Sequence, residues 1–172
     1  MNPAAALETD GITAPPAPLW KRRWFQNTAI VFLGILGLYA LIYHDIVSRA
    51  HESYNQAELY MQWAADPVAK QKHFDDIFAS SRAELEQQLA QKAIAEKDYR
   101  RRLDALEFDR DFAMSESSLK YAYQWYKDTY ELFSPPESRW VREARKKAPD
   151  VLAKWKQELR SQNVPFEDTM FE

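Results

Sequence analysis

Residues Phe25 to Tyr43 read FQNTAIVFLGILGLYALIY, nineteen positions without a charged side chain. As an α-helix this stretch would be about 28 Å long, close to the ~30 Å hydrocarbon thickness of a lipid bilayer. We therefore predict a transmembrane helix which, with its flanks, occupies residues 20–46. The alternative is a core helix of a soluble protein, and the basic and aromatic residues beside the run argue against it.

The flanks of the apolar run are typical of a membrane–water interface. We expect six residues to anchor the helix there: Trp20, Lys21, Arg22, Arg23, Trp24 and Tyr43. Short basic flanks stay on the cytoplasmic side of a membrane, and no basic excess follows the run. We expect a single pass through an inner (plasma) membrane, with the amino terminus cytoplasmic and the carboxyl-terminal domain periplasmic. The mitochondrial inner membrane is the alternative location.

A cleaved export signal is a competing interpretation of the same region. Arg22 and Arg23 begin a sequence with the look of a twin-arginine signal, and Ser48-Arg49-Ala50 resembles a small-residue cleavage site. Because the apolar run is long for a signal, we expect it to be retained as an anchor. Gly34, Gly37 and Ala40 lie along one side of the predicted helix, where small residues let a second membrane helix pack closely.

The composition of the 172 residues limits what the rest of the chain can be. There is no cysteine, which excludes disulfides, thiolate metal sites and cysteine nucleophiles. No glycine follows Gly37, so glycine-dependent phosphate loops, nucleophile elbows and primed hairpin turns are not expected. The formal net charge is −3. We predict an all-α chain in which one amino-terminal membrane helix precedes an extended or loosely bundled helical domain.

The expected organisation has four parts. Residues 1–19 form an Ala/Pro-rich cytoplasmic tail, typical of disorder unless a partner holds it. Residues 20–46 hold the membrane helix, residues 47–163 the helical outer domain, and residues 164–172 a terminal peptide. This peptide alternates apolar and acidic residues, and either docks as an extended segment or frays.

Within the outer domain, breakers and capping residues predict the helix boundaries. The membrane helix should continue to Ala65, and Asp66-Pro67 should begin the next helix, running to about Glu96. A further stripe of apolar residues extends to about Met114, with a short turn or no break near residues 95–98. A helix is expected over residues 119–133. Ser134 to Glu137 reads as a capping box that opens another helix, and Pro149 as the start of the last helix, ending near Asn163.

Aromatic residues are abundant in the outer domain, and we predict that they contact a protein partner. The candidates are Tyr121, Tyr123, Trp125, Tyr126, Trp140, Trp155, Phe166 and Phe171. The helix over residues 119–133 carries aromatic side chains on every side, more than a small bundle can bury. An aromatic core within the domain itself is the alternative. Residues 139–160 hold eight basic and three acidic residues, which suits anionic headgroups, an acidic partner, or packing on the bundle.

A search for catalytic or metal-binding chemistry yields no candidate. His44 and His51 are seven residues apart on one predicted helix, about 10 Å, which is too far to share a metal ion without ligands from elsewhere. His73 with Asp75 and Asp76 is a weaker group. We expect no cofactor, no metal site and no catalytic residues. Nucleic acid is an unsuitable partner because the net charge is negative and the domain is predicted outside the cytoplasm.

These features favour a non-catalytic accessory or structural subunit of a multi-subunit inner-membrane complex. Its expected partners are larger integral membrane subunits and the lipid bilayer, with no nucleic acid and no small-molecule substrate. The alternative is a membrane-anchored envelope adaptor or chaperone that binds clients through helical hairpins. An enzyme is the least favoured class, because no nucleophile, metal cage or cofactor loop is identifiable.

Overall fold

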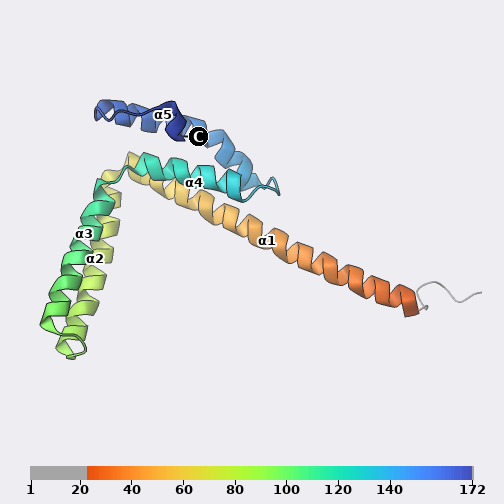
Figure 1. The fold of residues 1–172 in the computed structure, drawn as a ribbon, viewed down its shortest axis with the longest axis horizontal. Helices are drawn as coiled ribbons and strands as arrows, with labels where there is room; N and C mark the ends of the chain where they lie inside the picture. The colour runs from red at the N-terminus through yellow and green to blue at the C-terminus, as the bar shows by residue number, and fades with distance from the viewer. Residues whose placement is uncertain (1–22, 172) are drawn as a thin grey trace, which may run out of the picture. The chain divides into compact units, whose positions relative to one another are not determined.

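The computed structural model describes residues 23–171, and Figure 1 shows their fold. The helices are α1 (Arg23–Ala65), α2 (Pro67–Ala90), α3 (Glu96–Ser115), α4 (Ser118–Leu132) and α5 (Arg139–Ser161), with a short 3-10 helix, η2 (Asp168–Phe171). The described residues contain no strand, and the all-α prediction is confirmed. The chain divides into two compact units, Met1–Ile42 and Tyr43–Glu172, which are described separately.

The first unit, as far as it is described, is the apolar part of α1. Its composition and length suffice to cross a membrane, and none of its most apolar window is buried. Large side chains such as Leu33, Leu36 and Leu41 are exposed. The helix continues through the second unit to Ala65, as predicted, because neither glycine nor proline interrupts residues 38–65.

The junction between α1 and α2 follows the predicted capping chemistry. Pro67 occupies the first turn of α2, where its missing N–H costs no hydrogen bond. The Asp66 carboxylate accepts hydrogen bonds from the backbone N–H groups of Val68, at 3.1 Å, and Ala69, at 3.2 Å. These bonds satisfy two of the donors that a helix start leaves free.

Helices α2 and α3 lie side by side as a hairpin (Figure 1). The prediction that α2 extends to about Glu96 is wrong, because the helix ends at Ala90. Lys92 takes a left-handed conformation with φ 57°, and its N–H bonds the Leu89 carbonyl while that of Ala93 bonds the Gln88 carbonyl. This is a Schellman ending, which glycine usually forms. Because a lysine and not a glycine occupies the left-handed position, the sequence gives no sign of this helix end.

In the second unit, α4 and α5 pack with the later part of α1 around one core (Figure 1). The buried α1 residues Ala50, Ser53, Tyr54 and Ala57 recur at helical spacing and so share one face. Tyr121 stacks on Tyr60, whereas Thr129 lies against Ser53, so α4 runs antiparallel to α1.

The start of α5 differs from the predicted one. The helix begins at Arg139, not at Ser134, and Ser138 caps it by accepting a hydrogen bond from the Val141 N–H. The two prolines at 135 and 136 explain the difference. A residue before a proline is disfavoured in the helical conformation, so the segment stays a loop until the next serine.

The prediction that Pro149 starts a separate helix is also wrong. It lies inside α5, which is continuous to Ser161. An interior proline costs roughly 3 kcal/mol, since its nitrogen cannot donate to the carbonyl four residues before. Its neighbours Ala148 and Val151 are both buried in the core, so tertiary packing holds the helix together across the proline. The helix ends two residues before Asn163, close to the predicted end.

Candidate functional site

The second unit encloses a polar cluster centred on Glu58 of α1. Its carboxylate accepts hydrogen bonds from the Tyr126 hydroxyl of α4 and, at 2.5 Å, from the Lys147 ammonium of α5. The Lys147 nitrogen also lies 5.2 Å from the centre of the Tyr54 ring. This cluster therefore ties together α1, α4 and α5.

Electrostatics in this cluster favour one protonation state. Burial by itself raises the pKa of Glu58, but hydrogen bonds from Lys147 and Tyr126 outweigh it and lower the pKa below its ordinary 4.5. Burial lowers the pKa of Lys147, yet the contact with Glu58 raises it overall above 10.5. Burial and the Glu58 bond together raise the pKa of Tyr126 well above its ordinary value. Around neutral pH the cluster is an ion pair with a neutral tyrosine, a structural arrangement with no acid or base poised to react.

A second polar contact lies one turn away. The Thr129 hydroxyl is 2.8 Å from the Ser53 hydroxyl and 2.7 Å from the Trp125 carbonyl oxygen, and both hydroxyl-bearing residues are buried. Sequence reasoning missed both polar clusters. The only available signal was that Ser53 and Ala57 share the spacing of the buried face, which marks Ser53 as an inward-facing polar residue.

Most of the aromatic residues predicted to contact a partner instead form or border the hydrophobic core shared by α1, α4 and α5. Tyr123, Tyr126 and Phe171 are buried, and Trp125, Trp140 and Trp155 pack against them with part of their surface exposed. Tyr121 and Phe166 are also partly exposed. The structure thus realises the alternative of an aromatic core, and partner contact stays a prediction for the partly exposed members.

The carboxyl-terminal segment docks on the bundle as a 3-10 turn, whereas the sequence left open an extended or frayed peptide. The Phe171 ring packs edge-on to Trp155, with ring centroids 5.0 Å apart, and lies 5.5 Å from the Phe166 ring. The Tyr123 hydroxyl donates to the Phe171 carbonyl oxygen at 2.9 Å. Lys156 pairs with the exposed Asp168 at 2.6 Å. These contacts complete one side of the aromatic core.

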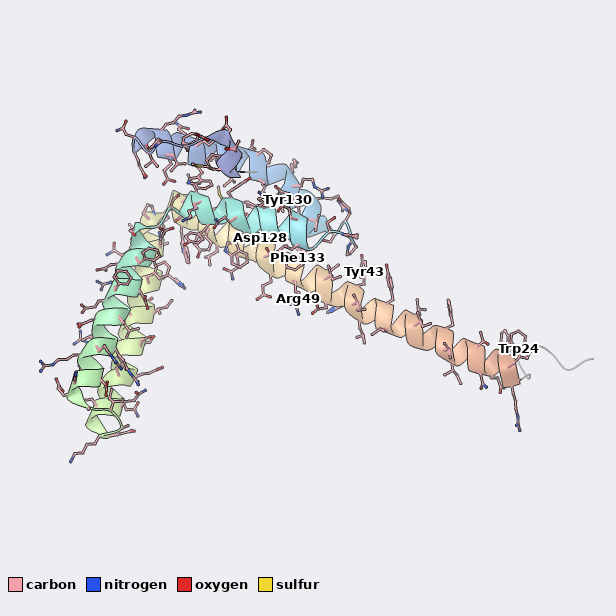
Figure 2. The ribbon with its side chains drawn as sticks, in the orientation of Figure 1. Trp24, Tyr43, Arg49, Asp128, Tyr130 and Phe133 are labelled. Carbon is pink, nitrogen blue, oxygen red and sulfur yellow. The ribbon has the colours of Figure 1, made fainter. Side chains whose placement is uncertain are left out.

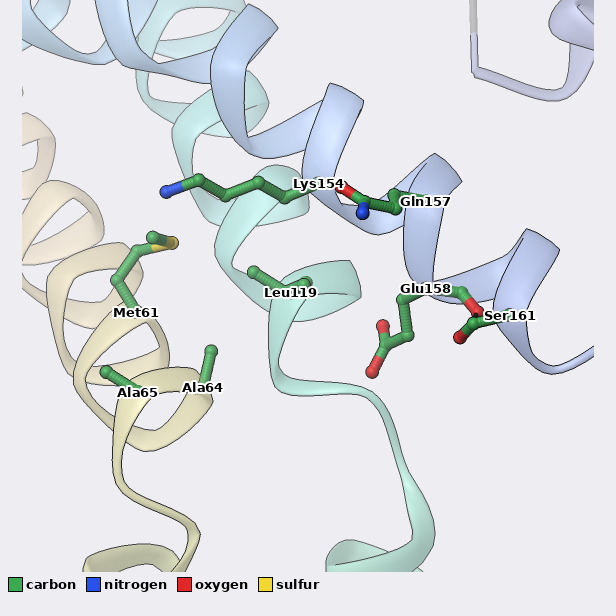
Figure 3. A pocket seen from close by; sticks show the side chains of 8 residues that line it. All are labelled: Met61, Ala64, Ala65, Leu119, Lys154, Gln157, Glu158 and Ser161. Carbon is green, nitrogen blue, oxygen red and sulfur yellow. Dashed lines mark hydrogen bonds between the residues drawn. The ribbon is translucent and has the colours of Figure 1, made fainter.

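An open hollow of about 450 Å³ lies where the end of α1 meets the start of α4 and the end of α5 (Figure 3). Apolar side chains, including Met61 and Leu119, form one side, and Lys154 and Glu158 of α5 form the other. The Glu158 carboxylate accepts a hydrogen bond from Ser117. A neighbouring hollow of about 560 Å³ shares several of these residues. The lining thus combines apolar side chains with the charged groups of Lys154 and Glu158.

The neighbouring hollow includes Lys70, a buried lysine of α2 that binds the end of α3. Its ammonium donates to the carbonyl oxygens of Met114, at 3.3 Å, and Glu116, at 2.7 Å, near the end of α3. Burial lowers the pKa of Lys70, opposed by the nearby carboxylates of Glu116 and Glu158. The carbonyls it binds are those that a helix end leaves without partners, so its role is structural.

The hairpin itself leaves an apolar face uncovered. Phe108 and Phe112 lie four residues apart on α3, with ring centroids 6.1 Å apart, and both are exposed. The face of α3 turned toward α2 carries the partly buried residues Leu103, Leu106 and Ala113, as the stripe predicts. Sequence reasoning did not single out the two phenylalanines, although their spacing places them together on the opposite face.

Two of the three histidines, His51 and His73, pack against aromatic rings. His51 stacks on Trp140, with ring centroids 4.0 Å apart, and His73 packs against Trp63 at 4.9 Å. Within residues 23–171, no group of three or more histidine, aspartate or glutamate side chains is placed to hold a metal ion.

Of the predicted membrane anchors, Trp20, Lys21 and Arg22 lie outside the described residues. Arg23, Trp24 and Tyr43 are exposed on α1, and Figure 2 labels Trp24 and Tyr43. The predicted helix-packing residues are Gly34, Gly37 and Ala40. All three are exposed, and a β-carbon added at either glycine would meet nothing within 4 Å. Comparison of the chain with family models, curated proteins and solved structures found no match.

Proposed function

We propose that this protein is a non-catalytic accessory subunit of a larger membrane complex. Its apolar helix crosses an inner (plasma) membrane once, with the amino terminus in the cytoplasm and the helical domain in the periplasm. The exposed, charge-free run and the basic residues before it support this topology. The domain braces neighbouring subunits and carries out no reaction of its own.

The observation that carries the proposal is the α2–α3 hairpin. Among its described residues, α3 has no buried side chain and α2 buries only Lys70 and Leu85. A helix pair that removes so little apolar surface from water gains little stability by itself. The exposed Phe108–Phe112 pair offers a further apolar face. A partner that covers this face would stabilise the hairpin and bury both rings.

Purification in a mild detergent tests this proposal. A full-length chain tagged at its carboxyl end should bring down a fixed set of larger membrane proteins at constant stoichiometry. Changing Phe108 and Phe112 together to Ser should remove at least one of them, whereas Glu107→Ser, at an exposed position on another face of the same helix, should not. A chain that purifies as a stable, lone monomer would contradict the proposal.

An envelope adaptor or chaperone remains the second candidate, since an exposed aromatic pair on a helical hairpin also suits transient binding of clients. The same purification separates the two functions. A subunit retains a constant set of partners, whereas an adaptor retains many proteins, each in small and variable amounts. Quantitative mass spectrometry of the co-purified proteins distinguishes these results.

A further inference from the structure

Two adjoining hollows lie in the seam between the helices of the α2–α3 hairpin. The first has a volume of about 230 Å³ and the second about 290 Å³, and Leu106 of α3 lines both. Contacts across the seam fix their order along the hairpin. Beside the first hollow, Arg110 lies 4.8 Å from the centre of the Phe78 ring. Beside the second, Arg102 donates to the Gln88 side chain at 3.4 Å. The two hollows therefore follow one another along the hairpin as one groove.

The residues of α2 that line this groove repeat with the period of a coiled coil. Three of them line the first hollow: Phe74, Ile77 and Phe78. Four line the second: Ser81, Glu84, Leu85 and Gln88. The second set begins seven positions after the first and occupies positions i, i+3, i+4 and i+7. In coiled-coil packing, four residues so spaced form the hole that receives a side chain of the neighbouring helix.

Helix α3 shows the same pattern. Its residues in the first hollow are again at positions i, i+3, i+4 and i+7: Leu106, Asp109, Arg110 and Ala113. The groove is open in the hairpin, since Ile77 is 47% exposed and α3 has no buried side chain. At about 1.5 Å per residue, a seven-residue repeat sets the holes about 10.5 Å apart. A third helix along the seam presents side chains at this interval every two turns, so it can fill both holes.

The groove is separate from the exposed Phe108–Phe112 pair, because neither phenylalanine lines a hollow. This pair on a second copy of the chain does not match the groove either. The two rings are four positions apart, about 6 Å along α3, whereas the holes are about 10.5 Å apart. The groove instead fits a helix whose large apolar side chains are seven positions apart.

Charged side chains on the rim of the groove specify the flanks of such a helix. Arg102 and Asp109 are seven positions apart on α3, and Glu84 lies on the α2 wall of the hollow that Arg102 lines. Among residues 23–171, none of these three side chains forms an ion pair. Their neighbour Arg110 is already paired with Asp111 at 2.8 Å. The rim thus offers one cation and two carboxylates to a helix of complementary charge.

We propose that the groove receives one amphipathic helix of a neighbouring subunit. Large apolar side chains of that helix, seven positions apart, enter the two hollows. Its flanks carry an acidic group toward Arg102 and a basic group toward Asp109. This docking site rests on the proposed function, in which the domain braces other subunits. With the third helix in place, the hairpin acquires the apolar core that its own two helices lack.

A synthetic helix tests the groove without knowledge of the natural partner. The probe is a fluorescent peptide of three heptads, about 21 residues, with leucine at the first and fourth positions of each heptad. Its binding to the full chain in detergent is followed by anisotropy. Ile77→Glu places a charge in the first hollow and should weaken binding at least about tenfold. Val68→Glu is the matched control, because Val68 is a 73% exposed β-branched residue of α2 outside the groove, and it should leave binding unchanged.

Two charge variants test the rim. Asp109→Arg makes both α3 rim positions basic and Arg102→Asp makes both acidic, so the result does not depend on the direction in which the peptide runs. A peptide with glutamate at its flanking positions should bind Asp109→Arg about tenfold more tightly than Arg102→Asp, because two exposed ion pairs become two like-charge contacts. A peptide with lysine there should show the opposite order. Equal affinities would overturn the charge pattern assigned to the partner helix.

Failure of the groove and failure of the proposed function give different results. The groove is overturned if no peptide binds up to about 100 μM. It is also overturned if Ile77→Glu leaves binding intact while changing Phe108 and Phe112 to Ser abolishes it. In either case, a parent chain that retains a fixed set of partners in mild detergent still upholds the proposed function.

The same purification extends the test to the natural partner. Ile77→Glu should release at least one protein from the fixed set, whereas Val68→Glu should release none. A parent chain that purifies alone would overturn the proposed function and the partner helix with it. A dimer of the chain that Ile77→Glu dissociates would assign the groove to a second copy and overturn the proposal.

Discussion

The most informative perturbation is the removal of the Glu58 carboxylate by Glu58→Ala. It takes away the acceptor for the Tyr126 hydroxyl, whose residue is only 1% exposed, and breaks the ion pair with Lys147. A buried donor without a partner costs about 1–3 kcal/mol. The ion-pair side chains are 34% and 41% exposed, so their loss adds only about 0.5–1 kcal/mol. The expected loss in unfolding free energy is about 1.5–4 kcal/mol.

For a folding unit of this size, 1 kcal/mol corresponds to about 3–4 °C in Tm. The variant should therefore melt roughly 5–16 °C below the parent when the full chain in detergent is followed by circular dichroism. Glu86→Ala is the matched control, because that glutamate forms an exposed i,i+4 pair with Arg82 and should change Tm by no more than 1–2 °C.

A double-mutant cycle identifies the cause of the loss. Adding Tyr126→Phe removes the stranded donor, so the double variant should be less destabilised than the sum of the two single variants. Equal melting temperatures for Glu58→Ala and Glu86→Ala would refute the assignment of Glu58 as the central polar contact of the bundle.

Four further outcomes follow from the same structure. The lowered pKa of Glu58 makes its contribution present above pH 4.5 and lost as pH falls through the lower folded value, so the acid limb of a stability–pH profile should flatten in Glu58→Ala. Phe171→Ala, at a 9% exposed ring packed on two aromatic neighbours, should cost about 3 kcal/mol in denaturant titrations, whereas Met170→Ala, at a 70% exposed residue, should cost almost nothing. Pro149→Ala should raise the unfolding free energy by about 1–3 kcal/mol by restoring an interior helix hydrogen bond, and an unchanged midpoint would count against that reason. Lys92→Gly should stabilise the hairpin by about 0.5–1 kcal/mol, seen as slower amide exchange in α2 and α3, because glycine adopts the left-handed conformation without strain.

Local chemistry explains where sequence reasoning succeeded. The continuity of α1 requires only an uninterrupted run of helix-compatible residues, and the start of α2 requires only an aspartate cap before a proline. Each of these features acts over one or two helical turns, so it can be read from neighbouring residues. The same is true of the stripe along α3.

Tertiary contacts determine the features of the fold that local sequence patterns do not predict. Pro149 lies within a helix because Ala148 and Val151 are buried against other helices, and no local rule reveals that gain. The aromatic residues of α4 became a core because α1 and α5 approach from two sides and the carboxyl-terminal Phe171 closes the cluster.

The polar cluster around Glu58 shows most clearly what the sequence alone does not predict. Tyr126 lies 68 positions after Glu58 in the chain, and Lys147 lies 89 positions after it. In the sequence, each of the three resembles an ordinary surface residue. The amino-acid order determines the apolar run, the helical class and most helix starts, because those depend on short-range propensity and hydrophobic pattern. Which polar groups meet inside the bundle is decided only when the helices pack, since burial and charge pairing depend on distances between segments remote in the chain.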